Sequence, residues 1–258
     1  MIPKKLGWKK DKYDKRDYMH AKVAIIPNIV ILDKWVPSIR DQGDLGSCVG
    51  FGIGANLTSI AKKLNIFTEW FSPTWIYNGA RYLEGSLLHD DGCEPRNAMK
   101  WISSKGNLLE HFWPYDPIKL DTNTPSSANA TEAIKRPITT YFRVTGVDGI
   151  CSAISQGYFV SIGTPWYDKW VDAVGPDGVL AEVTSRETPA GGHETCLFGY
   201  DRTKQIFYGI NSWSDGWGKH GMYEMPFSSF AAFNFQGGYD AHYMTATWAA
   251  VPVPVPVP

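Results

Sequence analysis

The chain has 258 residues, a formal net charge of −1 and 43% hydrophobic residues, a balance typical of a globular protein that buries a sizeable core. Its near-neutral charge gives no indication of a nucleic-acid partner, and none of its apolar runs approaches the ~18 residues of a membrane span. The charged N-terminus has no apolar segment behind it, so the sequence predicts no secretory signal.

Four cysteines are spread through the chain, and no two of them form a C-x-x-C pair. We therefore expect no metal site and no cofactor. Four cysteines are too few for a disulfide framework in a chain of this length. They indicate reduced thiols and a cytoplasmic or virion-associated setting.

The first half of the chain predicts an irregular arm followed by helices. Residues 1–35 are poor in periodicity and rich in Pro, Asp and Lys, which predicts an arm without long helices. From Cys48 onward, apolar residues at spacings of three and four predict a helix that is buried on most sides. Ser72-Pro73 is typical of a second helix start, with Ser72 as the cap, and a third helix is expected over Pro95–Ser104. Residues 114–131 predict a surface crossover.

The second half predicts strands, with one helix near Ile150–Ile154 between the first two of them. The expected strands are Thr139–Val144, Phe159–Ile162, Val179–Thr184, Glu194–Tyr200, Gln205–Ile210 and Met222–Met225. Helices first and strands second indicate an α+β protein with two lobes. The expected segments are an arm at 1–35, a helical lobe at 36–118, a β-rich lobe at 119–250 and a flexible Val-Pro tail at 251–258.

The two strongest strands predict a hairpin that joins a histidine to a carboxamide. If the turn centres on Arg202 and Thr203, paired residue numbers sum to 405, and His193 lies opposite Ser212, beside Asn211. The Asn211 oxygen would then accept the imidazole N–H and orient the ring. Trp213 follows and would cover that hydrogen bond.

Cys48 is the candidate nucleophile. At a helix N-terminus its thiolate is stabilised by the macrodipole, and an adjacent imidazolium would leave a thiolate–imidazolium pair at neutral pH. The side-chain amide of Gln42 and the backbone N–H of Cys48 would hold the developing oxyanion. Gly46 and Ser47 precede the nucleophile, and Gly46 lets a substrate backbone approach closely. A lone cysteine in an apolar helix is usually a core residue, so the combination of these residues carries the prediction.

Three motifs together resemble the papain-like cysteine peptidases. The first is Gln-Gly-x-x-Gly-Ser-Cys at 42–48, and the second leads from Gly192-His193 to Gly199-Tyr200. The third is Asn-Ser-Trp-Ser-Asp-Gly-Trp-Gly at 211–218, where the family has Asn-Ser-Trp-Gly-x-x-Trp-Gly. Ser72-Pro73 and other short matches resemble the prokaryotic and viral branch, and the resemblance covers roughly residues 14 to 230. It implies a helical lobe with a central helix starting at the cysteine, an antiparallel β-barrel-like lobe, and a cleft between them.

The resemblance also implies roles for individual residues. Cys48 would be the nucleophile and His193 the general base and acid, with Asn211 and Gln42 assisting. Peptide or protein substrate would be the partner and would lie across the cleft. The expected substrate-binding residues are Gly46, Ser47, Gly192 and Trp213.

Several positions depart from the family pattern. Val49 stands where an aromatic residue is usual, and Ser214 replaces a glycine. Glu194 follows the histidine where a small apolar residue is usual, and on a strand it should point away from His193. The ~40 residues before Gln42 are too few for the long propeptide of secreted relatives, although the arm could still cover the cleft.

Three functions remain in competition. The first is a cysteine peptidase acting through an acyl-enzyme on Cys48. The second is an amidase or acyl transferase using the same residues, and the third is a catalytically silent papain-like module for binding or assembly. Cleavage specificity, the choice between endo- and exopeptidase, and oligomeric state are left open by the sequence.

Overall fold

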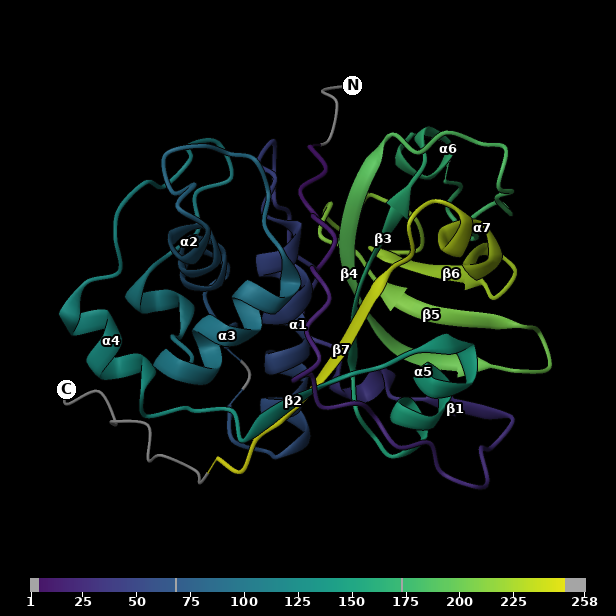
Figure 1. Ribbon diagram of the computed structural model, residues 1–258, viewed down its shortest axis with the longest axis horizontal. Helices are drawn as coiled ribbons and strands as arrows, with labels where there is room; N and C mark the ends of the chain where they lie inside the picture. The colour runs from purple at the N-terminus through teal and green to yellow at the C-terminus, as the bar shows by residue number, and fades with distance from the viewer. Residues whose placement is uncertain (1–4, 68, 173, 249–258) are drawn as a thin grey trace.

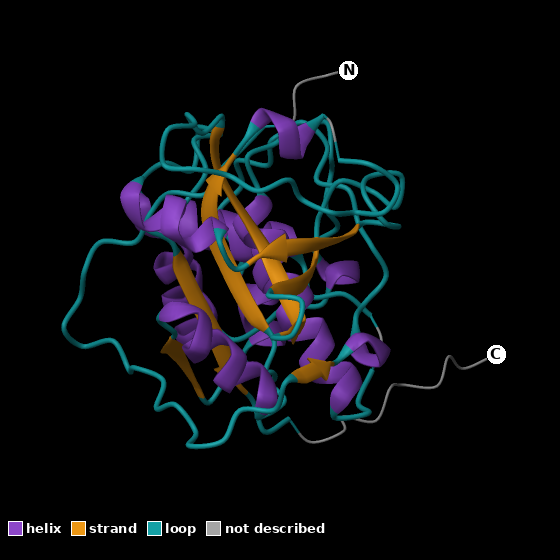
Figure 2. Cartoon of the chain, turned by 90° about the vertical axis from the view of Figure 1, so that its right-hand side faces the viewer, coloured by secondary structure: helices purple, strands orange, loops and turns teal. Residues whose placement is uncertain are grey.

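The computed structural model describes residues 5–67, 69–172 and 174–248, so the Val-Pro tail predicted at 251–258 lies outside the described residues. Helices α1 to α4 lie on one side of the molecule, and an antiparallel sheet lies on the other (Figure 1). Seen from the side of the sheet, the strands lie in front of the helices of the other lobe (Figure 2). The predicted two-lobe α+β architecture is confirmed.

The central helix, α1, spans Cys48–Lys63 and begins at the candidate nucleophile, as predicted. It is buried on almost every side because glycines allow neighbours to approach its backbone. A Cβ added at Gly50 would lie 2.7 Å from the carbonyl oxygen of Pro73 in α2, and one added at Gly52 would lie 3.0 Å from Cγ of Glu194. The helix therefore lies against α2 on one side and the sheet on the other, which places Cys48 between the lobes.

Helices α2 (Pro73–Glu84) and α3 (Pro95–Lys105) confirm the predicted starts, and α3 ends one residue after the predicted Ser104. The Ser72 side chain accepts a hydrogen bond from the Trp75 amide at 3.1 Å, which satisfies one free N–H of the first turn. The hydroxyl of Ser72 also donates to the carbonyl of Trp113 at 2.6 Å. One side chain thus caps α2 and ties it to the segment after α3.

We expect Ser72→Ala to lower the free energy of unfolding by about 1–2 kcal/mol, because both hydrogen bonds of the buried cap are lost. Urea unfolding at unchanged m-value measures the loss. Ser126→Ala is the matched control, since Ser126 caps the short helix α4 (Ser127–Ala133) only through the exposed amide of Asn129. An equal loss in both variants would contradict the role given to Ser72.

The sheet has the strand order β2-β7-β3-β4-β5-β6, with β1 added on β4, and its pairs are antiparallel. Its strands are β1 Ile29–Ile31, β2 Thr140–Arg143, β3 Val160–Trp166, β4 Gly191–Asp201, β5 Ile206–Ile210, β6 Met222–Pro226 and β7 Asp240–Thr245. The remaining helices are α5 Gly146–Ser155, α6 Asp168–Val171 and α7 Ser229–Phe235, with 3₁₀ turns at Asp33–Trp35 and Glu110–Phe112.

Several features differ from the prediction, among them strand β1 within the predicted arm and helices α6 and α7, none of which was expected. The expected strand Val179–Thr184 is wrong, because the segment makes a single bridge to Glu224 and buries Leu180 and Val183 in the core instead of forming a ladder. Helix α4 lies in part of the segment predicted as a crossover. Strand β7 was not predicted, because polar and apolar side chains are both buried along it and leave no alternation.

Two hydrophobic clusters form the cores of the lobes. One is built around the sheet and α5, and the other around α1, α2 and α3. Ala133 of α4 packs in the core of the helical lobe, although it lies beyond residue 118, where the sequence places the end of that lobe. Within the described ranges, no helix combines the length and apolar character that a membrane span requires.

Candidate active site

Cys48 and His193 lie where α1 contacts β4, and no hydrogen bond joins the thiol to His193 Nδ1 in the described residues. Both residues are fully buried. The Cys48 thiol lies among the backbone amides of Glu194, Gly7 and Val49, so it is adjacent to the peptide that follows His193. The structure therefore brings together the two motif segments that are 145 residues apart in the sequence.

The imidazole of His193 is held on one edge by Asn211. His193 Nε2 lies 2.7 Å from Asn211 Oδ1, and the backbone N–H of Ser212 donates to the same oxygen at 2.7 Å. Because Asn211 Oδ1 accepts from a backbone amide, it is the amide oxygen, and His193 Nε2 must carry the hydrogen. Nδ1 is then the unprotonated nitrogen, and it has no hydrogen-bond partner among the described residues.

Trp213 covers this hydrogen bond, as expected. Its ring stacks on the imidazole of His193 with centroids 4.4 Å apart and an interplanar angle of 27°. Trp166 contacts the imidazole edge-on at 4.8 Å. Since Trp213 and Trp166 are both buried, water is kept from the bond between His193 and Asn211.

The predicted hairpin register is wrong although its conclusion about His193 and Asn211 holds. Paired residue numbers sum to 407 near the turn and to 406 beyond it, with an irregularity between Leu197 and Gly199. The turn centres on Thr203 and Lys204 instead of Arg202 and Thr203, which raises the sum by two. A bulge that adds one residue to β4 lowers it by one from Leu197 onward. The strand β5 ends at Ile210, and Asn211 reaches His193 from the loop beyond it.

Gln42 lies at the same end of the site. Its Nε2 donates to the carbonyl oxygens of Leu45 at 2.7 Å and Lys5 at 3.2 Å, and its Oε1 accepts from the Ser212 hydroxyl at 2.6 Å. The Gln42 amide is thus fixed in orientation, and one of its hydrogens points at a carbonyl of the N-terminal arm.

The four expected substrate-binding residues divide into two pairs. Gly46 and Gly192 line the path of the N-terminal arm. The hydroxyl of Ser47 instead contacts Tyr115 at 2.6 Å, and the Trp213 ring lies over His193. Gly46 and Gly192 therefore lie at the cleft surface under the arm. Ser47 and Trp213 instead contact neighbouring side chains, Tyr115 and His193.

The N-terminal arm runs between the lobes, as the purple segment at the centre of Figure 1 shows. The Trp8 amide donates to the Gly192 carbonyl at 2.9 Å on the β-rich lobe. On the helical lobe, Cys93 N–H donates to Gly7 O at 2.9 Å, and Lys9 N–H donates to Cys93 O at 3.1 Å. The arm is therefore an extended segment paired with backbone groups of both lobes directly over Cys48.

A buried cluster of charges, here called the arm clasp, fixes the next part of the arm. It consists of Asp11 and Asp17 of the arm, Arg96 of α3, Arg143 of β2 and Asp240 of β7. Arg96 pairs with Asp17, and Arg143 lies 2.6 Å from Asp240 and 3.5 Å from Asp11. Since its arginines come from different lobes, the arm clasp joins both lobes through the arm.

Burial sets the protonation of the candidate catalytic pair in this structure. Burial raises the pKa of the Cys48 thiol to about 12, and the backbone amides of Glu194 and Gly7 offset this only in part. Burial also lowers the pKa of His193 to about 4, although the hydrogen bond to Asn211 opposes the shift. At neutral pH this form holds a neutral thiol and a neutral imidazole, so the expected ion pair is absent while the arm covers the site.

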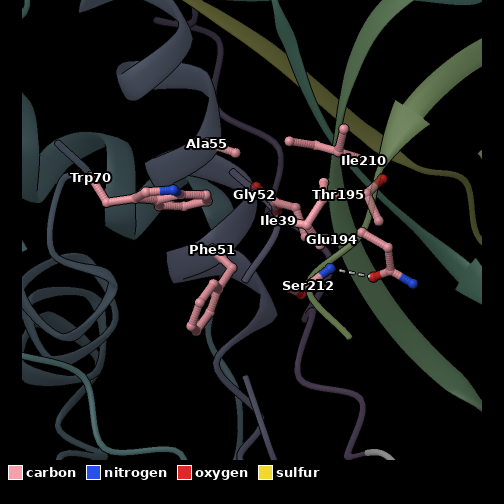
Figure 3. Close-up of a pocket in the computed structure, with 10 residues that line it drawn as sticks. Ile39, Phe51, Gly52, Ala55, Trp70, Glu194, Thr195, Ile210 and Ser212 are labelled. Atoms are coloured by element: carbon pink, nitrogen blue, oxygen red, sulfur yellow. Dashed lines mark hydrogen bonds between the residues drawn. The ribbon is translucent and has the colours of Figure 1, made fainter. Parts of the chain in front are cut away.

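Behind the pair lies a small cavity between α1 and the strands β4 and β5 (Figure 3). Phe51, Gly52 and Trp70 line it on one side, and Thr195 and Ile210 on the other. The space in which the centre of a water molecule can move is about 10 Å³, which is close to the minimum needed to hold one water. It is too small for a peptide side chain. Across the described residues, no group of His, Cys, Asp and Glu side chains has the arrangement of a metal site.

Comparisons with known proteins agree with this geometry. A family described as papain family cysteine protease matches residues 31–230. An uncharacterized peptidase C1-like protein of Acanthamoeba polyphaga mimivirus is 29% identical over 268 residues, which cover 92% of this chain and 86% of that protein.

Two solved structures share the fold. Xylellain, a cysteine protease from Xylella fastidiosa, has a TM-score of 0.85 at 24% identity and covers 96% of this chain and 99% of its own. The bromelain protease from Ananas comosus, solved with the E64 inhibitor, has a TM-score of 0.61 at 20% identity and covers 85% of this chain and 99% of its own. The match over 31–230 shows that the chain belongs to the papain family of cysteine proteases.

Proposed function

We propose that the protein hydrolyses peptide bonds through a thioester acyl-enzyme on Cys48. Its sulfur attacks the substrate carbonyl while His193 Nδ1 takes the thiol proton, and His193 then gives that proton to the leaving amine. Water hydrolyses the thioester in a second step, with His193 again as the base. Asn211 orients the imidazole, and no cofactor takes part.

The observation that carries the proposal is the fixed tautomer of His193. Because Asn211 Oδ1 accepts from both Ser212 N–H and His193 Nε2, the ring cannot present its hydrogen to the thiol. Its basic nitrogen is Nδ1, which is buried and has no partner in the described part of the chain. Buried ring nitrogens are usually hydrogen-bonded, and a general base needs one nitrogen free to take a proton. The buried His242 also lacks hydrogen bonds within the described ranges, so the free nitrogen of His193 counts together with its bond to Asn211 and its position beside Cys48.

The contact between Gln42 and the arm supports the oxyanion role proposed for Gln42. Its Nε2 lies 3.2 Å from the carbonyl oxygen of Lys5, so this amide already binds a peptide oxygen at the site. We expect Gln42→Ala to lower kcat by about a hundred- to a thousandfold with a smaller change in KM, because an oxyanion donor acts mainly in the transition state.

Steady-state kinetics on one fluorogenic peptide measures the effect of Gln42→Ala. The matched control is Gln156→Ala, since Gln156 lies at the end of α5 and bonds only within that helix. A change confined to KM would contradict the oxyanion role of Gln42.

Two other functions stay in competition. An amidase or acyl transferase would use the same acyl-enzyme with a different acceptor. A silent binding or assembly module is favoured by the buried state of Cys48 under the arm.

Incubation with a mixture of denatured proteins, followed by mass spectrometry of the termini formed, tests the proposal. New peptide termini that depend on Cys48 support it. Transfer to added nucleophiles without hydrolysis favours the acyl transferase, and no product from a chain with a displaced arm favours the silent module.

A further inference from the structure

The side chain of Trp8 fills a pocket on the sheet beside the candidate active site. Its ring lies over two glycines of neighbouring strands. A Cβ added at Gly163 would lie 2.1 Å from Trp8 Cδ1, and one added at Gly192 would lie 2.4 Å from Trp8 Cε3. Both strands therefore lack side chains where the indole lies, and together they make a flat-floored slot.

Glu194 lies on the same face of the sheet as this slot. It follows Gly192 by two residues on β4, and it is the direct partner of Gly163 on β3. Residues two apart on a strand, and direct cross-strand partners, point to the same face. The side chain of Glu194 therefore stands on the indole's side of the sheet, away from His193, as the sequence predicted.

Glu194 is a buried acid without a partner. It is 1% exposed, and neither carboxyl oxygen has a hydrogen-bond partner among the described residues. Burial and the carboxylates of Asp11 and Asp240 raise the pKa of Glu194 well above its usual range. The indole N–H of Trp8 is also buried and has no hydrogen-bond partner among the described residues. The arm therefore fills the slot without forming a hydrogen bond to the carboxyl group of Glu194.

The other charges nearby are balanced separately. Asp240, the partner of Gly163 on β7, is paired with Arg143, and Arg96 is paired with Asp17. Asp11 belongs to the arm and leaves with it. Once the arm is displaced, Arg143 still neutralises Asp240. His242 loses its contact with Asp11 but stays neutral, because burial and the two arginines lower its pKa to about 3. Glu194 then has no paired cation among the described residues.

We propose that the slot now filled by Trp8 is a specificity pocket that selects peptides with a basic side chain, arginine above lysine, through Glu194. This inference rests on the proposed function. An arginine stem packs over glycines as the indole does, and its planar guanidinium matches a flat slot and a carboxylate. A neutral side chain leaves the buried carboxyl unpaired, which disfavours it.

The test uses the full chain with Gly7→Ala, a substitution expected to weaken the seating of the arm because its Cβ would lie 1.8 Å from the Gly46 carbonyl oxygen. Peptides that vary at one position at a time are compared, with Arg, Lys, Met and Leu at each. We expect the value of kcat/KM for Arg to exceed that for Leu by about tenfold to a hundredfold at a single position. In the Glu194→Gln background, the ratio of Arg to Leu should fall to near one.

Hydrolysis without a basic preference, or with a preference that Glu194→Gln leaves intact, would overturn the inference while supporting the proposed function. If no peptide is cleaved, the proposed function fails and the pocket is tested separately through the arm. Trp8→Arg and Trp8→Met are each combined with Glu194→Gln in the full chain, and thermal unfolding is measured.

The arm measurement depends on no catalysis. Trp8→Arg should lower Tm less when Glu194 is present than in the Glu194→Gln background, whereas Trp8→Met should lower Tm equally in both. Equal losses for Trp8→Arg in the two backgrounds would overturn the inference.

Discussion

Replacing Gly7 with alanine is expected to raise peptide hydrolysis about tenfold or more. A Cβ at this position would lie 1.8 Å from the carbonyl oxygen of Gly46, a backbone atom that cannot move aside without shifting the start of α1. Overpacking of this kind typically costs about 1–3 kcal/mol, which would weaken arm docking by about fivefold to 150-fold. Initial rates on a fluorogenic peptide measure the gain.

The same variant should change the pH dependence of Cys48 alkylation. Only the thiolate reacts, and with the arm seated, burial holds the pKa of Cys48 at about 12, so the labelling rate should still be rising in alkaline solution. When Gly7→Ala exposes the thiol, the burial effect is lost and the midpoint should move to lower pH. Iodoacetamide labelling followed by intact mass across a pH series reports this shift.

Tyr13→Ala is the control for both measurements, because Tyr13 lies on the arm but is 90% exposed. It should change neither the rate nor the midpoint. If Gly7→Ala behaves like Tyr13→Ala, the arm does not restrict access to Cys48 in solution.

Cys48→Ala and His193→Ala should each lower kcat/KM by at least about a thousandfold, and the double variant should be little worse than either one. Residues that act as one unit in nucleophilic catalysis give such non-additive losses. Kinetics on the Gly7→Ala background measures the effect. Cys151→Ala is the matched control, since Cys151 is also a buried free cysteine but lies in α5, away from the site.

A residual rate in Cys48→Ala equal to that of the parent would mean that another group carries the reaction. Additive losses in the double variant would contradict a direct proton transfer between Cys48 and His193.

Local signals explain what the sequence predicted well. The start of α1 at Cys48 follows from apolar spacing, and the start of α2 follows from the Ser72 cap and Pro73. The nearness of His193 and Asn211 follows from a short hairpin turn, and a register error of one or two residues did not separate them. Each of these signals depends on residues close together in the chain.

Long-range features were less predictable. Whether Val179–Thr184 pairs as a strand depends on which backbone groups lie beside it in the fold. The side chains of this segment do not indicate which groups those are. Strand β7 places Asp240 beside Gly163, a contact between residues far apart in sequence. Of the polar residues that obscured β7, Asp240 is buried as the partner of Arg143 in the arm clasp.

The arm shows the same limit most clearly. The arm binds in the cleft through main-chain hydrogen bonds of Gly7, Trp8 and Lys9. Any residue with a backbone N–H and C=O can make such bonds. The local sign is glycine at positions 7, 92 and 192, where an added Cβ would meet neighbouring atoms. The sequence therefore predicted an arm, but its path between the lobes required the structure.

The most direct test of the central claim is labelling of the Gly7→Ala chain by an epoxysuccinyl inhibitor under reducing conditions, read by intact mass and peptide mapping. The account predicts one adduct, on Cys48, absent in Cys48→Ala and strongly slowed in His193→Ala. A folded protein that forms no adduct, or one labelled at Cys48 equally fast without His193, would contradict a thiol activated by His193.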